Sequence, residues 1–133
     1  MTQNKLSVII PTLYKKPLVL IKSIEQLDRD ESVDEIIIIS NCECKIQFPQ
    51  TEKLQAWAPE TNAFVNPSWN LGIKLSKNNN FLLLNDDILL CENFCSKVVN
   101  SDVFNDPKTG LMGLANECIN NFDSKETDDI DYP

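Results

Sequence analysis

The sequence predicts an α/β protein, a three-layer α/β/α sandwich around a mainly parallel sheet. Three observations support this class. Short apolar runs typical of strands alternate with segments of helical periodicity. One run holds four consecutive isoleucines without polar alternation, which is typical of a strand buried on both faces in a parallel sheet. The length of 133 residues, with 42% hydrophobic and 24% charged residues, fits one globular domain.

The first strand and the first helix follow each other closely. We expect a strand over Lys5–Ile10, ended by Pro11. Pro17 then opens a helix, since proline is tolerated in a first helical turn. The helix should end near Arg29. Its apolar positions recur at helical spacing and are Leu18, Leu20, Ile21, Ile24 and Leu27.

The middle of the chain contains two further strand candidates and one ambiguous segment. Glu35–Ser40, with its isoleucine run, is the second strand, and Leu54–Ala58 is a short third one. A polar loop over 59–67 follows, after which Ser68 is a candidate helix cap. The apolar residues of 69–76 fit a strand and a helix equally well.

The last third of the chain carries another apolar run and a polar end. Phe81–Leu84 is expected to be a buried strand, and 88–90 a short extended piece. A helix is expected over 92–104 and a last strand over 110–115. We expect the domain to span 1–119, because from residue 120 the chain is acidic and polar, which predicts a flexible tail over 120–133.

Composition excludes several classes of function. Twelve basic against twenty acidic residues give a net charge of −8, which repels the phosphate backbone of a nucleic acid. The chain has no histidine, so Ser-His-Asp and Cys-His catalysis are excluded. Three glycines are too few for a glycine-rich dinucleotide-binding loop. Carboxylates remain as the groups best suited to carry chemistry.

Targeting signals and cysteines bear on location. No apolar run approaches the roughly 20 residues that span a bilayer, and the start of the chain lacks the apolar core of a signal peptide. The five cysteines form an odd set, which suggests reduced thiols. We therefore expect a cytoplasmic protein without a transmembrane segment.

The strand ends indicate where a ligand would bind. In parallel α/β sheets, ligands lie in the crevice outside the carboxyl ends of the strands, here Pro11-Thr12, Ser40-Asn41 and Asn85-Asp86-Asp87. Two carboxylates about 4 Å apart repel by roughly 4 kcal/mol at a dielectric constant of about 20, and a divalent cation reverses that repulsion. Oxygen ligands favour Mg²⁺ or Mn²⁺. The alternative is a solvated turn, as we expect for Asp128-Asp129 in the polar tail.

Four sequence blocks resemble the GT-A glycosyltransferases of the family 2 type, in the same order and spacing. They are Ser7-Val-Ile-Ile-Pro-Thr12, Glu35-Ile-Ile-Ile-Ile-Ser40-Asn41, Asn66-Pro-Ser-Trp-Asn70-Leu-Gly72-Ile and Phe81-Leu-Leu-Leu-Asn85-Asp86-Asp87. The resemblance covers residues 5–90. It implies the GT-A fold, which is a Rossmann-like fold of nucleotide-diphospho-sugar transferases. It also assigns the ambiguous segment to a helix, in which Gly72 allows close packing.

The resemblance implies a function and a set of site residues. The chain would transfer a sugar from a nucleoside diphosphate, with UDP-sugars the foremost candidates, to a hydroxyl of a glycan or other acceptor. The metal ligand, for Mn²⁺ or Mg²⁺, would be Asp87 in the D-x-D-like motif Asn85-Asp86-Asp87. Residues expected at the nucleotide sugar are Pro11, Thr12, Tyr14, Ser40, Asn41, Asn66, Asn70 and Asp86.

The sequence departs from that family at informative places. Ser40 stands where an aspartate usually holds the base, and Asn85 stands where many members have the first aspartate. The chain ends soon after the donor half, so the acceptor half that such enzymes carry is expected to be missing. No residue matches the catalytic base.

Two other functions remain open. A catalytically inactive domain that binds nucleotide sugars or partners would fit the missing acceptor half. A receiver-like signalling domain is also small, acidic and α/β, but it carries an acidic pair after the first strand, where this chain has Pro11-Thr12.

Overall fold

The computed structural model describes residues 4–113, and their elements alternate as the sequence predicts. The strands are β1 (Leu6–Thr12), β2 (Val33–Ser40), β3 (Leu54–Trp57) and β4 (Phe81–Leu83). The helices are α1 (Pro17–Arg29), α2 (Val65–Leu75), α3 (Phe94–Val99) and α4 (Asp102–Asn105). The bounds of α1 agree with those predicted from its proline start and helical periodicity.

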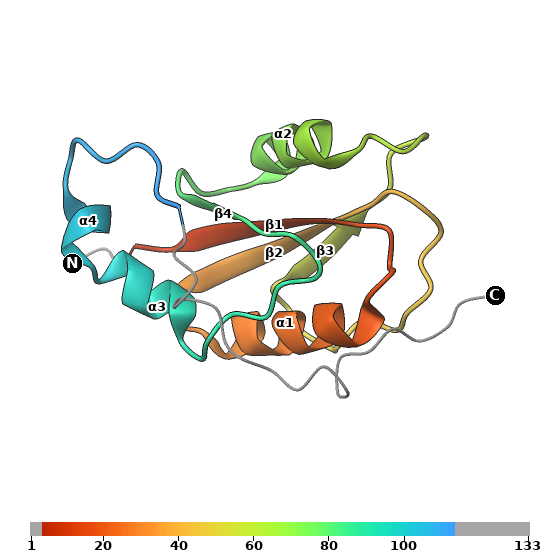
Figure 1. The fold of residues 1–133 in the computed structure, drawn as a ribbon, viewed down its shortest axis with the longest axis horizontal. Helices are drawn as coiled ribbons and strands as arrows, with labels where there is room; N and C mark the ends of the chain where they lie inside the picture. Colours follow the sequence, from red (N-terminus) through yellow and green to blue (C-terminus); the bar gives the residue numbers. More distant parts are fainter. Residues whose placement is uncertain (1–3, 114–133) are drawn as a thin grey trace.

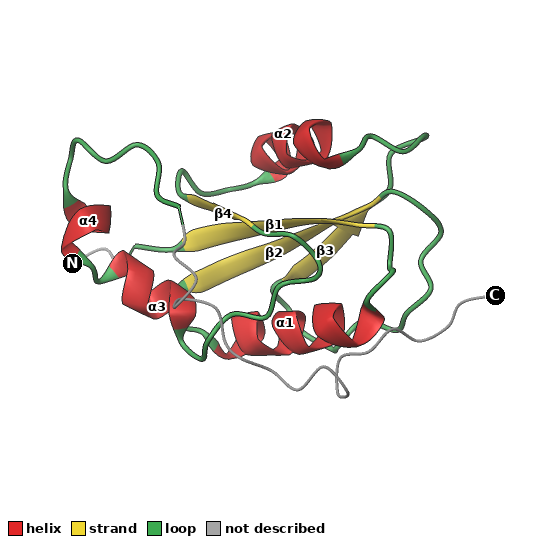
Figure 2. Cartoon of the chain, in the orientation of Figure 1, coloured by secondary structure: helices red, strands yellow, loops and turns green. Residues whose placement is uncertain are grey.

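The four strands form one sheet in the order β3-β2-β1-β4, and all the pairings are parallel. Helix α2 covers one face of the sheet, and α1 covers the other (Figure 1). Figure 2 shows the resulting three layers, with α3 and α4 near the amino ends of the strands. The predicted α/β fold class is confirmed.

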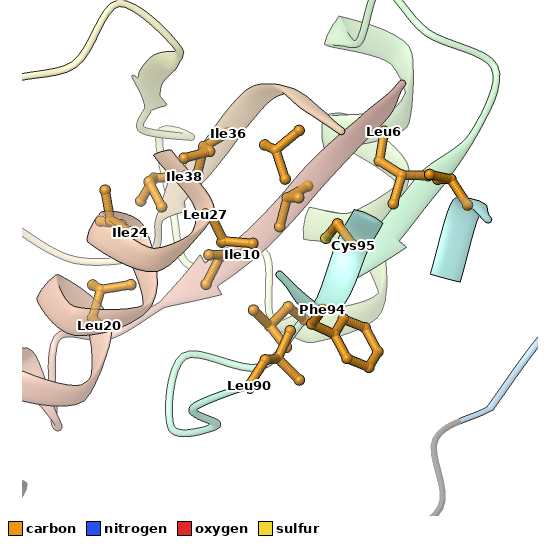
Figure 3. Close-up of a cluster of buried hydrophobic side chains, with 14 of the residues drawn as sticks. Leu6, Ile10, Leu20, Ile24, Leu27, Ile36, Ile38, Leu90, Phe94 and Cys95 are labelled. Atoms are coloured by element: carbon orange, nitrogen blue, oxygen red, sulfur yellow. The ribbon is translucent and has the colours of Figure 1, made fainter. Parts of the chain in front are cut away.

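The core lies on both faces of β1 and β2. On one face, alternate residues of the two strands, such as Ile10 and Ile36, pack with Leu20 and Ile24 of α1 and Phe94 of α3 (Figure 3). On the other face, Ile9, Ile37 and Ile39 pack against apolar residues of α2. All four isoleucines of β2 are fully buried, as their lack of alternation predicts.

Strand β1 continues through Pro11 to Thr12, so the prediction that Pro11 ends it is wrong. The backbone N–H of Ser7 donates to the carbonyl of Asn80, and the carbonyl of Ile9 accepts from the N–H of Leu84. The backbone N–H and C=O groups of the odd-numbered residues of β1 therefore point toward the β4 side of the sheet. The pairing with β4 stops at Ile9. The missing N–H of Pro11 therefore points to a side where no strand lies, and no ladder bond is lost.

Strand β4 is shorter and more exposed than predicted. It ends at Leu83 and lies at the edge of the sheet, where the side chain of Leu83 is 39% exposed. Leu84, expected within the strand, follows it and is buried. Phe81 and Leu82 are partly buried and pack against the core, so the run of 81–84 covers one sheet edge and has its buried residue at Leu84.

Helix α2 begins at Val65, so Ser68 lies inside it and is not its cap. The hydroxyl of Ser68 donates instead to the carbonyl of Phe64, one turn back. The helical assignment of 69–75 is confirmed, and Gly72 is its point of close approach to the sheet. A Cβ on Gly72 would lie 2.3 Å from Cγ2 of Ile9.

The end of the described chain differs from prediction. The expected helix over 92–104 is divided into α3 and α4, because the Ser101 hydroxyl accepts from the N–H of Phe104 and caps a new helix. Residues 110–113 form no strand, and the rest of the expected strand and the tail of 120–133 lie outside the described residues. No helix within 4–113 is long and apolar enough to cross a membrane.

Candidate functional site

The strand order creates a switch point beside β1. From β1 the chain passes to β2 and β3 on one side, and then returns to β4 on the other side. Helices α1 and α2 consequently cover opposite faces of the sheet (Figure 1). Beyond the carboxyl ends of β1 and β4 the connections diverge, which leaves room for a ligand at this edge.

An open cleft of about 370 Å³ lies at this switch point. Six of its lining residues come from the predicted strand ends: Pro11, Thr12, Asn41, Asn85, Asp86 and Asp87. The other six are Leu13, Lys15, Lys16, Asn62, Phe64 and Val65. Residues from the carboxyl end of β1 and from the segments that follow β2 and β4 thus line one cleft.

Thr12 joins the ends of β1 and β4. Its hydroxyl donates to Oδ2 of Asp86 over 2.7 Å and accepts from the backbone N–H of Tyr14 over 2.9 Å. Tyr14 has a positive φ of 58°, which turns the chain away directly after the strand. The side chain of Asp86 is thereby held in a fixed position at the wall of the cleft.

The two aspartates of the turn have different environments. Asp86 is half-buried, and this burial raises the pKa of its carboxyl group above the ordinary value; the charge of Asp87 raises the pKa further, while the bond from Thr12 opposes both. Asp87 is exposed and lines the cleft. The pair thus offers one anchored carboxylate and one that is accessible to a ligand.

Asn41 ties the second side of the cleft together. Its Oδ1 accepts from the N–H of Ala63 over 3.0 Å, and its Nδ2 donates to the hydroxyl of Ser68 over 2.9 Å. Its own N–H donates to the carbonyl of Thr12. Asn41 therefore fixes the loop before α2 to the ends of β1 and β2.

Tyr14 and Ser40, both expected at the nucleotide, do not line this cleft. Their hydroxyl groups form a hydrogen bond with each other, and both side chains are buried. The ring of Tyr14 packs near that of Phe48, with 6.3 Å between the ring centroids. Burial raises the pKa of the Tyr14 phenol, so this hydroxyl stays protonated at neutral pH.

Asn66 and Asn70, the remaining expected site residues, lie one turn apart on α2. Both are exposed, and neither lines the cleft. The structure therefore brings together Pro11, Thr12, Asn41, Asp86 and Asp87, and leaves Tyr14, Ser40, Asn66 and Asn70 outside the cleft wall.

Two lysines and an aromatic residue of the cleft were not singled out from the sequence. Lys15 and Lys16 directly follow the turn after β1, so their position next to Pro11-Thr12 was an available signal in an otherwise acidic chain. Phe64 gave no such signal, because its place depends on the path of a loop.

The described residues contain no cluster of three or more histidine, cysteine, aspartate or glutamate side chains suited to a metal ion. An ion at Asp87 would therefore need further ligands from water or from a bound molecule. This is the usual situation of Mg²⁺, which is held by one or two carboxylates together with phosphate oxygens.

Comparison with known proteins finds similarity in structure alone. No family model matches the chain, and no curated protein sequence does. The crystal structure of S. aureus TarS is 16% identical with a TM-score of 0.53, and the match covers 70% of this chain and 18% of TarS. That of S. aureus TarS 1-349 is 18% identical with a TM-score of 0.52, covering 70% of this chain and 30% of the other.

This similarity concerns the fold. TarS is a GT-A-like glycosyltransferase, and the present chain spans less than a third of either TarS structure. At such identity the comparison supports a glycosyltransferase fold in general and not family 2 in particular. The chain thus shares the α/β fold of glycosyltransferases, with a cleft at the switch point of its sheet.

Proposed function

We propose that this chain binds a nucleoside-diphosphate sugar in the cleft and serves the transfer of its sugar to a hydroxyl of a glycan or other acceptor. One observation carries the proposal. The Asp86-Asp87 turn follows β4 at the switch point, and Thr12 from β1 holds Asp86 there. Acidic residues at this point of a glycosyltransferase fold suit a metal-bound diphosphate.

The chemistry of the cleft fits a divalent cation, Mn²⁺ or Mg²⁺, at Asp87. This carboxylate is exposed on the cleft wall, and its negative charge helps to raise the pKa of the Asp86 carboxyl group. A cation there would relieve the repulsion between the two groups. When bound, the ion would supply Lewis-acid stabilisation for the charge that develops on the departing nucleoside diphosphate.

The chain's own residues have distinct proposed roles. Thr12 keeps Asp86 oriented toward the donor, and Asp87 offers the carboxylate for the cation. Lys15 and Lys16, on the same cleft, supply positive charge near the phosphate oxygens. Pro11 and Asn41 bound the space left for the nucleoside.

A second candidate function is binding of a nucleotide sugar without catalysis. Asp86 and Asp87 are the carboxylates among the residues that line the cleft, and the proposal assigns both to the donor side. No described lining residue is left to act as a base for the acceptor hydroxyl. Turnover separates the two functions: release or transfer of sugar that Asp87→Asn abolishes would eliminate the binding-only function.

Calorimetric titration with a panel of UDP-sugars, with and without Mn²⁺, tests the proposal. We expect binding that requires Mn²⁺ and that weakens at least about tenfold in Asp87→Asn, since a metal ligand is lost. Glu31→Gln is the matched control, because Glu31 is an exposed carboxylate in a turn between α1 and β2, at the opposite end of the sheet. Absence of Mn²⁺-dependent binding to every nucleotide sugar would overturn the proposal.

A further inference from the structure

Phe64 is held in an unfavourable backbone conformation at the mouth of the cleft. It lies directly before α2 with φ of 59° and ψ of −173°, a region that is adopted almost only by glycine. Its ring is 70% exposed and therefore gains little from burial in the core. Neither its backbone preference nor the hydrophobic effect explains a phenylalanine here.

The surroundings of Phe64 impose this conformation. The N–H of Phe64 donates to Oδ1 of Asn62 over 2.8 Å, and its carbonyl accepts from the hydroxyl of Ser68. The preceding residue, Ala63, is held by Asn41. Strain that neighbouring residues maintain in this way is typical of ligand-binding positions. In this arrangement Phe64 lines the cleft and stays exposed.

The cleft has a charged end and an aromatic end. Asp86 and Asp87 follow β4, whereas Asn41 holds the loop with Phe64 against the end of β2. Strand β1 lies between β2 and β4, so the two ends are separated by its width. A nucleoside diphosphate bound through its phosphates near Asp87 would have its uncharged base on the side of Phe64.

No other aromatic side chain is among the described residues that line the cleft. Tyr14, the aromatic residue expected there from sequence, points into the core and bonds to Ser40. Flat aromatic ligands gain most from stacking on an exposed ring. The remaining ring in the cleft is therefore that of Phe64.

We propose that Phe64 is the stacking platform for the base of the bound nucleotide. This inference rests on the proposed function and extends it by assigning a base-binding residue. Stacking uses the face of the base, and Phe64 would thus determine how tightly the nucleoside part is held while leaving the diphosphate contacts to the other end.

Two variants of Phe64 test this assignment. Phe64→Gly removes the ring and relieves the backbone strain, so the variant should be at least as stable to thermal unfolding as the original chain. Phe64→Tyr keeps a ring. Trp57→Ala is the matched control, because Trp57 is a half-exposed aromatic residue on β3 outside the cleft.

The probes are UDP with Mn²⁺, uridine, and pyrophosphate with Mn²⁺. We expect Phe64→Gly to weaken UDP and uridine binding by roughly 5- to 160-fold, the range for loss of one base stack. Pyrophosphate binding should not change, and Phe64→Tyr and Trp57→Ala should bind UDP as the original chain does. In proton NMR, the uracil protons should move upfield on binding, and this shift should vanish in Phe64→Gly.

The outcomes distinguish the role of Phe64 from the proposed binding of a nucleotide in the cleft. If Phe64→Gly binds UDP as tightly as the original chain, the role of Phe64 is overturned while the nucleotide site stands. If Phe64→Gly loses pyrophosphate binding as well, the residue shapes the whole cleft and does not act as a platform, which also overturns the assignment. If the original chain binds none of the three probes, the proposed function itself is wrong, and the role of Phe64 with it.

Discussion

At the scale of single residues, the candidate site depends on a few polar contacts between strand ends. The hydroxyl of Thr12 donates a hydrogen bond to Asp86 and accepts one from the N–H of Tyr14. Asn41 plays a similar part on the other side of the cleft. The positions of these groups follow from the strand-end rule, but their partners do not, because bonds such as Thr12–Asp86 join residues distant in sequence.

We predict that Thr12→Val destabilises the chain although valine has a similar shape. The half-buried Asp86 carboxylate would lose a donor, and the N–H of Tyr14 would lose its acceptor. A hydrogen bond to a charged group contributes about 1.5–3 kcal/mol, so the free energy of unfolding should fall by about that amount. Urea denaturation measures the change.

Thr109→Val is the control for that substitution. Thr109 is partly exposed, and its hydroxyl forms no side-chain hydrogen bond within residues 4–113. Its replacement should change the free energy of unfolding by no more than about 0.5 kcal/mol. Equal stabilities of the two variants would show that the Thr12–Asp86 contact contributes nothing to the fold.

At the scale of elements, the helices and strands whose signals are local in the sequence were predicted best. Helix α1 has a proline start and a clear apolar period, and β2 has its isoleucine run, so both were found from sequence. The end of β1 was predicted wrongly, because whether Pro11 interrupts the strand depends on where β4 ends. The start of α2 was placed too late because the bonds of Asn62 and Asn41 that set up the turn at Phe64 are not local periodic signals.

The contact between α2 and β1 gives a prediction at this scale. We expect Gly72→Ala to lower the free energy of unfolding by about 1–3 kcal/mol, the usual cost of overpacking a core. The added Cβ would lie 2.3 Å from Cγ2 of Ile9, a fully buried residue in the central part of the sheet. Circular dichroism during thermal unfolding measures the loss.

A compensating substitution provides the control for Gly72. Ile9→Ala removes Cγ1 and Cγ2 of Ile9, the two side-chain atoms that would lie nearest to the new Cβ. We expect Ile9→Ala combined with Gly72→Ala to be less destabilised than the sum of the two single variants. Strict additivity, or an unchanged melting temperature in Gly72→Ala alone, would show that the helix can move away from the sheet without cost.

At the scale of the whole molecule, the net charge limits the size of an anionic ligand, and the two lysines of the cleft provide local positive charge. A net charge of −8 opposes binding of a polyanion, while two lysines and a cation at Asp87 would suffice for one diphosphate. The strand-end rule therefore predicted from sequence where the cleft lies. It could not supply Lys15, Lys16 or Phe64, since loop residues reach the cleft only through the folded path of the chain.

The central claim is that Asp87 binds a cation that also contacts the diphosphate of a nucleotide sugar. Crystals grown with Mn²⁺ and a UDP-sugar, measured near the manganese absorption edge, test it most directly. We predict an anomalous peak beside the carboxylate of Asp87, with diphosphate oxygens among the other ligands of the ion. Manganese bound elsewhere, or diphosphate bound in the cleft with no metal at Asp87, would contradict the account.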